Sequence, residues 1–146
     1  MPARVHHTAV VCSDVELTLR FYRDGLGMDV MMDEVFDGDW PTLFDAPASR
    51  LRSIFLGSAD DPTGGIVELV SFEEDVEPAP KDRAPAYGFF LVSLYVDVDA
   101  TLARLAAFGV QPEGRIELAT PRGTVQMATV RDPDGVLVEL TGVPVT

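Results

Sequence analysis

Two glutamates, Glu68 and Glu139, carry the most chemical information in the sequence. Each stands inside an apolar run, at residues 66–70 and 137–140, where a buried and unpaired carboxylate would be costly. A cation held between two such carboxylates would remove their mutual repulsion. The alternative is that each glutamate faces water on the polar side of a half-buried strand. Strand alternation, however, puts Glu68 on the same face as the apolar Ile66 and Val70, which argues against simple solvation.

The histidines limit what this site can be. His6 and His7 are the only two in the chain, and as neighbours in a strand they should point to opposite faces, so that at most one serves a given site. This geometry excludes the two-histidine, one-carboxylate iron site of non-haem oxygenases. No nucleophile motif accompanies the histidines, which argues against a Ser-His-Asp site.

An internal repeat predicts that the two glutamates hold equivalent positions. Residues 61–69 align without a gap on residues 132–140, and six of the nine pairs are identical. Earlier in each copy, residues 14–19 are echoed by residues 97–102, where each segment follows an apolar strand and opens a helix. The sequence therefore predicts a duplicated strand-helix-three-strand module, an α+β fold in which both carboxylates can reach one cleft.

The elements of the first module follow from local patterns. Residues 5–12 favour a strand, and Ser13 and Glu16 form a capping box for the helix that follows. That helix has an apolar stripe, and Gly25 and Gly27 should end it in left-handed conformations. The stripe consists of Val15, Leu19, Tyr22 and Leu26. Further strands are expected at 28–35, 53–56 and 66–72, and each Asp-Pro-x-Gly segment should be a tight turn.

Composition narrows the partners. The chain has 146 residues, 47% of them hydrophobic, and 24 acidic against 11 basic side chains. A negative field of this size disfavours nucleic acid and membrane surfaces as partners. No export signal or membrane span is expected, so we predict a soluble cytoplasmic protein. Cys12, the single cysteine, lies in an apolar strand, where an inert buried thiol is expected.

Four motifs in order resemble the vicinal oxygen chelate superfamily, the group of glyoxalases, bleomycin-resistance proteins and extradiol dioxygenases. They are residues 7–14 (HTAVVCSD), 21–27 (FYRDGLG), 67–69 (VEL) and 131–140 (RDPDGVLVEL). The resemblance covers nearly the whole chain. It implies a single domain over residues 1–146, made of modules at about 5–72 and 88–143 around a half-barrel cleft. The connector between them, residues 73–87, is rich in proline and charge.

The resemblance also implies a metal site with one broken position. In metal-using members, each module contributes one ligand from its first strand and one from its last, which here gives His7, Glu68 and Glu139. The fourth position falls on Leu91 if the strand is aligned without a gap, or on Phe90 if the helix start is held fixed, and neither binds a metal. The site then has three ligands and an open position, for Zn, Mn, Mg, Ni or Co, or it holds no metal.

Other residues describe a substrate pocket. Aromatic and apolar side chains on or beside the predicted strands can line a cleft, and two arginines can orient an anionic or carbonyl group. For each aromatic, core packing is the competing interpretation, and Arg122 falls in a turn where solvent exposure is expected. The pocket candidates are Trp40, Phe44, Phe55, Phe89, Leu91, Tyr95, Met127, Arg52 and Arg122.

Two functions follow from these features. The first is a glyoxalase- or epimerase-like lyase or isomerase, in which a divalent metal polarises a carbonyl-containing substrate while Glu68 or Glu139 moves a proton. The second is a metal-free protein that sequesters a small aromatic or cationic molecule, as bleomycin-resistance proteins do. A dioxygenase is disfavoured by the histidine count. Small proteins of this group usually pair, so we expect a homodimer.

Overall fold

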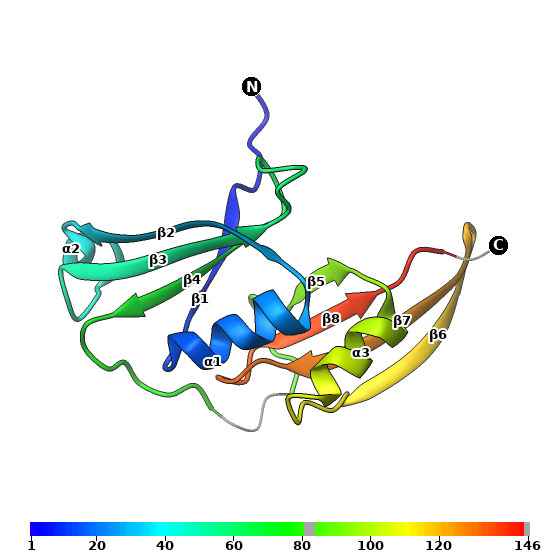
Figure 1. Ribbon diagram of the computed structural model, residues 1–146. Helices are drawn as coiled ribbons and strands as arrows, with labels where there is room; N and C mark the ends of the chain where they lie inside the picture. Colours follow the sequence, from blue (N-terminus) through cyan, green and yellow to red (C-terminus); the bar gives the residue numbers. More distant parts are fainter. Residues whose placement is uncertain (81–83, 145–146) are drawn as a thin grey trace. The chain divides into compact units, whose positions relative to one another are not determined.

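The strands of the computed structural model, which describes residues 1–80 and 84–144, form two four-stranded sheets (Figure 1). The first sheet has the order β1-β4-β3-β2 and the second the order β5-β8-β7-β6. The strands of the first are β1 (His7–Val11), β2 (Asp29–Asp37), β3 (Arg50–Gly57) and β4 (Ile66–Phe72). Those of the second are β5 (Val92–Tyr95), β6 (Gly114–Thr120), β7 (Gly123–Arg131) and β8 (Leu137–Thr141).

The two sheets have the same topology. In each, the first and last strands of the module pair in parallel, and the remaining neighbours pair antiparallel. One helix follows the first strand of each sheet, α1 (Val15–Leu19) in the first and α3 (Val98–Ala106) in the second. This arrangement confirms the α+β fold of two tandem βαβββ modules.

The helix starts differ in one detail from the prediction. Asp14, rather than Ser13, caps α1 by accepting a hydrogen bond from the backbone N–H of Leu17 at 3.0 Å, and Asp97 caps α3 in the same way through Ala100. An aspartate one residue nearer the helix reaches the free N–H groups of the first turn, so the capping box at Ser13 is wrong.

The first helix also ends differently. It continues as a π-helical segment, η1 (Arg20–Gly25), and only Gly27 of the two predicted glycines has a positive φ, of 80°. The expected stripe is buried at Leu19, Tyr22 and Leu26. A third helix, α2 (Trp40–Phe44), lies between β2 and β3.

Contacts divide the chain into two compact units. Unit 1 comprises residues 1–23 and 28–78, and unit 2 comprises residues 24–27 and 79–146. Within unit 1, the side chains of Ile54, Leu56 and Leu69 are almost completely buried. In unit 2, the same is true of Leu105, Val130 and Leu140.

The turn before β8 is held by Asp132. Its carboxylate accepts hydrogen bonds from the backbone N–H groups of Asp134 and Val136, both at 2.9 Å, and Gly135 has a φ of 87°. Asp132 is itself buried. This is the tight turn predicted from the Asp-Pro-x-Gly motif, and it fixes the start of the strand that carries Glu139.

Between β4 and β5 the described residues of the connector form neither helix nor strand. Its residues 81–83 lie outside the described part of the chain. Among the described residues, no helix has the length and apolar character required to span a membrane.

Candidate functional site

Glu68 lies in the middle of the first sheet, with β1 on one side and β3 on the other. Its ladder partners are Ala9 on β1 and Phe55 on β3. Because residues directly opposite each other share a face and alternate residues return to it, His7 also lies on the face of Glu68.

Both carboxylate oxygens of Glu68 are engaged. The Nε2 atom of His7 lies 3.4 Å from Oε1, and the hydroxyl of Ser53 donates to Oε2 at 2.5 Å. The Glu68 side chain is only 16% exposed, whereas that of His7 is 35% exposed. Glu68 is therefore neither a solvated surface carboxylate nor an unpaired buried one, and His7 presents its outer ring nitrogen to it.

The two histidines do not point to opposite faces. The Nδ1 atoms of His6 and His7 lie 2.7 Å apart, and both rings contact Phe55, with centroid distances of 5.8 and 5.5 Å. The prediction is wrong because β1 begins at His7, so His6 precedes the strand and does not follow its alternation.

Glu139 occupies in the second sheet the ladder position that Glu68 occupies in the first. On β8 it pairs with Ser93 of β5 and Thr129 of β7. The hydroxyls of Ser93 and Thr141 donate to its Oε1 atom at 2.8 and 3.3 Å. Hydroxyl groups thus replace the histidine that accompanies Glu68.

The ladder register, extended one residue before the start of β5, favours Leu91 over Phe90 as the equivalent of His7. Ala9 pairs with Glu68 and Ser93 pairs with Glu139, so the residue two positions before Ser93 matches His7. That residue is Leu91. The Phe90 alternative assumed a fixed distance to the helix cap, but the distance is five residues from Ala9 to Asp14 and four from Ser93 to Asp97.

The donor set of unit 1 fits a divalent cation. An imidazole nitrogen and a carboxylate oxygen that share one tetrahedral ion lie about 3.4 Å apart when each bond is about 2.1 Å. His7 Nε2 and Glu68 Oε1 have this separation, and Ser53 supplies the outer hydrogen bond that orients a ligating carboxylate. Within the described residues no three His, Cys, Asp or Glu side chains gather as a metal-binding group.

Three of the predicted pocket residues lie on the faces that carry the glutamates. Phe55 is directly opposite Glu68, and Tyr95 and Met127 both pair with Thr141, which shares its face with Glu139. Tyr95 is largely exposed and lines a hollow of about 480 Å³ in unit 2, beside Asp97 and Gln126.

The other apolar candidates lie outside the sheets. Trp40 and Phe44 stack on each other in α2 with nearly parallel rings and a centroid distance of 5.6 Å. Phe89 precedes β5 and is 74% exposed, and Leu91 is partly buried. Arg122 lies in the turn between β6 and β7 and is exposed, as expected.

Arg52 lies on the face opposite Glu68. Its neighbour Ser53 points to Glu68, so Arg52 points away, and it donates two hydrogen bonds to Asp33 at 2.8 and 2.7 Å. These bonds hold the pKa of the Asp33 carboxyl below its ordinary value and raise that of Arg52. The guanidinium is therefore already engaged by a carboxylate.

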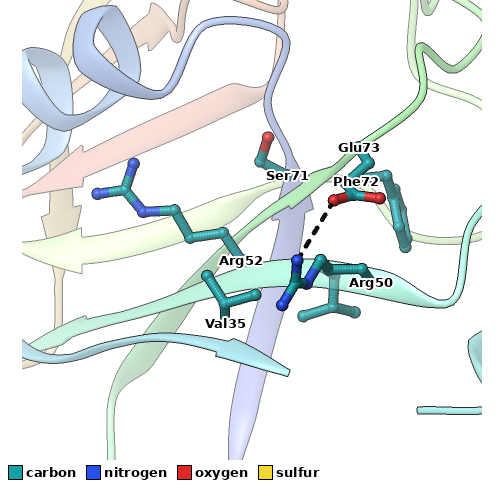
Figure 2. A pocket seen from close by; sticks show the side chains of 7 residues that line it. Val35, Arg50, Arg52, Ser71, Phe72 and Glu73 are labelled. Carbon is teal, nitrogen blue, oxygen red and sulfur yellow. Dashed lines mark ion pairs between the residues drawn. The ribbon is translucent and has the colours of Figure 1, made fainter. Parts of the chain in front are cut away.

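Arg52 is one of the residues that line a hollow of about 360 Å³ in unit 1 (Figure 2). Figure 2 shows the Arg52 guanidinium extending away from the pair formed by Arg50 and Glu73, whose charged atoms lie 3.8 Å apart. Arg50 also pairs with Asp37 at 3.1 Å. Both arginines beside this hollow are thus paired with acidic side chains.

Sequence reasoning missed the hydroxyl groups that hold the glutamates. Ser53, Ser93 and Thr141 were not singled out, although each is a polar residue within or at the end of an apolar strand segment. The same criterion that drew attention to Glu68 and Glu139 would have found Ser53 and Ser93.

Comparisons with known proteins identify relatives along most of the chain. The model of the glyoxalase family, described as the Glyoxalase/Bleomycin resistance protein/Dioxygenase superfamily, matches residues 4–140. A relative from Aspergillus terreus, the lactoylglutathione lyase-like protein terB, is 40% identical and covers 96% of this chain and 75% of its own length. A probable lactoylglutathione lyase of Vibrio cholerae is 26% identical over 94% of this chain and 88% of its own length.

Solved structures share the fold. A glyoxalase family protein from Bacillus cereus matches with a TM-score of 0.79 and 19% identity, covering 99% of this chain and 97% of its own. The trypanothione-dependent glyoxalase I of Leishmania major matches with a TM-score of 0.65 and 22% identity, covering 97% and 87%. The match of the family model to residues 4–140 and the 40% identical relative show that the chain belongs to the glyoxalase, bleomycin-resistance and dioxygenase superfamily.

Proposed function

We propose that this protein is a glyoxalase-type lyase that acts on a small carbonyl compound with the help of a divalent cation. The observation that carries the proposal is the contact between His7 Nε2 and Glu68 Oε1 at 3.4 Å, together with a second glutamate at the equivalent ladder position. The relatives named as lactoylglutathione lyases support the same reaction class.

In this proposal His7, Glu68 and Glu139 hold the cation. When bound, the cation polarises the oxygens of the substrate and makes the neighbouring C–H more acidic. In this proposal Leu91 takes the fourth ligand position of the family, which leaves one more position for the substrate or water.

Glu139 is the better candidate for the proton-transferring base. Glu68 uses both oxygens, one toward His7 and one toward Ser53, so its carboxylate is fixed. Both hydroxyl groups that bond Glu139 donate to the same oxygen, Oε1. We propose that Oε2, on which neither hydroxyl donates, takes a proton from carbon and returns it to the neighbouring carbon or oxygen.

Apolar side chains beside the glutamates would keep water from the substrate. Phe55 lies opposite Glu68, and Tyr95 and Met127 lie beside Glu139 on its face. Removal of water strengthens the electrostatic interactions of the carboxylates with the substrate. Phe89, Trp40, Phe44 and Arg122 remain proposed contributors to this pocket.

The test does not require the substrate to be known in advance. The protein is loaded with Mn²⁺, Ni²⁺, Co²⁺, Zn²⁺ or Mg²⁺ and incubated in D₂O with small carbonyl compounds, including lactoylglutathione and mixtures of methylglyoxal with glutathione. Cation-dependent exchange of the C–H beside the carbonyl, seen by NMR, is the expected result. If no cation binds and no exchange occurs with any compound, the proposal is wrong.

A second candidate function is a metal-free binding protein, and the observation that favours it is Leu91 in the place of His7. The net charge of −13 would favour cationic ligands. Calorimetry in the presence of a chelator separates the two functions. Unchanged affinity for an aromatic cation after chelation, without exchange chemistry in the loaded protein, would favour sequestration. The expected homodimer and the cytoplasmic location stay predictions.

A further inference from the structure

Of the two histidines, the proposed function uses His7 and not His6, yet the His6 ring contacts the His7 ring. The Nδ1 atoms of His6 and His7 lie 2.7 Å apart, a hydrogen-bond distance, while the other ring nitrogen of His7 faces Glu68. Both nitrogens of the His7 ring therefore have a partner, and these partners lie on opposite sides of the ring.

Two ring nitrogens at this distance hold one proton between them. One must donate and the other accept, because two protonated nitrogens would place two hydrogens in the same space. If His7 binds a cation through Nε2, that nitrogen carries no proton, and the neutral ring carries its proton on Nδ1. The Nδ1 atom of His6 is then the acceptor.

Packing holds the two rings in this arrangement. The His6 and His7 rings meet edge to face with a centroid distance of 5.0 Å, and both contact the ring of Phe55. Because His6 precedes β1, its side chain is free to turn to the side of His7. Phe55 is in turn opposite Glu68 in the ladder, so the same ring borders both contacts of His7.

We propose that His6 is a positioning residue for His7: it accepts the Nδ1 proton of His7 and so keeps the Nε2 lone pair directed at the cation site. The inference rests on the proposed function. Outer partners of ligating histidines are usually carboxylates, carbonyl oxygens or water, and an imidazole takes that place here. A ligand role for His6 is disfavoured because, when its Nδ1 atom accepts from His7, the neutral ring carries its proton on Nε2 and has no lone pair left for a cation.

Two variants separate the hydrogen bond from the packing. His6→Phe keeps an aromatic ring against Phe55 but removes the acceptor, and His6→Asn restores an acceptor oxygen near the place of Nδ1. We expect His6→Phe to weaken Co²⁺ or Zn²⁺ binding by about 10- to 100-fold, as the loss of other outer partners does. His6→Asn should recover most of the affinity. His7→Ala, which should abolish binding, verifies that the titrated ion occupies this site.

A second readout uses metal-free protein labelled with ¹⁵N in histidine. The wild type should show a scalar coupling between the two Nδ1 atoms across the shared proton, and His6→Phe should lose it and shift the tautomer balance of His7. If the coupling is absent, or if both variants bind the cation as the wild type does, the inference is wrong. Equal losses in His6→Phe and His6→Asn also overturn it. Failure of the wild type to bind any cation defeats the proposed function, while the coupling still decides the His6–His7 contact.

Discussion

Glu68 and Glu139 stand at the same point of two sheets with the same strand order, yet their surroundings differ. Glu68 is held at both oxygens, by His7 and by Ser53. Glu139 accepts from two hydroxyl groups at one oxygen, and no histidine of its own module stands beside it among the described residues. The backbone ladder thus fixes where a carboxylate lies, and its neighbours determine what it can do.

In the proposed function, Glu68 is a fixed ligand, whereas Glu139 is both a ligand and the proton-transferring base. Unit 1 offers a nitrogen and an oxygen at a separation suited to a cation, with the carboxylate immobilised by a buried serine. Unit 2 offers a carboxylate with an oxygen on which neither hydroxyl donates. The following changes test or sharpen that contrast.

The largest effect is expected from Glu139→Gln. Losing one of three proposed ligands should weaken divalent-cation binding by more than about 100-fold, beyond the loss that outer partners cause. Titration calorimetry measures it, with the exposed Glu77→Gln as a control that removes the same charge. Equal affinity in the two variants would show that Glu139 does not share a site with His7 and Glu68.

Ser53→Ala should weaken cation binding more than Ser93→Ala does. Ser53 is the hydroxyl on Oε2 of Glu68, and its loss should weaken cation binding by about 10- to 100-fold. Glu139 keeps Thr141 when Ser93 is replaced, so a smaller loss is expected there. Adding Thr141→Val to Ser93→Ala should raise that loss toward the Ser53→Ala value. A larger effect of Ser93→Ala alone would reverse the assigned roles.

Leu91→His should make the two modules more alike. If the register of β5 continues one residue before the strand, residue 91 matches His7, and a histidine there should tighten cation binding by about 10-fold by filling the open position. Phe90→His, one residue away, is the matched control and should leave the affinity unchanged. Tighter binding by Phe90→His instead would mean that the pairing of β5 and β8 is shifted by one residue.

The smallest effect is expected at Asp33, whose ion pair with Arg52 joins the two strands whose equivalents in unit 2 are joined by a hydrogen bond from the uncharged amide of Gln126 to Glu117. Both side chains of the ion pair are more than a third exposed, at 36% and 39%, so Asp33→Asn should cost less than about 1 kcal/mol of unfolding free energy. Urea unfolding measures it against Asp60→Asn.

The effect should depend on pH in one direction. The pKa of Asp33 is lower in the folded protein than its ordinary value of 3.8, so the pair stabilises the fold above that value. The contribution is lost as the pH falls through the folded-state pKa. The difference between wild type and Asp33→Asn should therefore disappear in acid. A difference that persists there would point to packing instead of charge.

The sequence predicts the strands and their order better than it predicts the side-chain contacts between them. Apolar alternation and the repeated Asp-Pro-x-Gly segment predict β4 with its observed bounds and place Glu68 and Glu139 at equivalent positions. Side-chain partners across strands depend on register, which local patterns do not reveal, so Ser53 and Ser93 were missed. The predicted direction of the His6 side chain was wrong because His6 precedes β1 and does not follow the alternation of the strand.

The turn closed by Asp132 has a consequence for how this chain can vary in length. Side chains in a strand alternate with a period of two, so one residue added between Gly135 and Glu139 would turn the carboxylate to the opposite face, and two would return it. The segment from Ser93 to Asp97 is one residue shorter than the segment from Ala9 to Asp14. Both segments end at the aspartate that caps a helix. We therefore expect the segment before a helix to tolerate the insertion of one residue. Before β8, where the hydrogen bonds to Asp132 fix the start of the strand, only insertions of an even number of residues should keep Glu139 on its face.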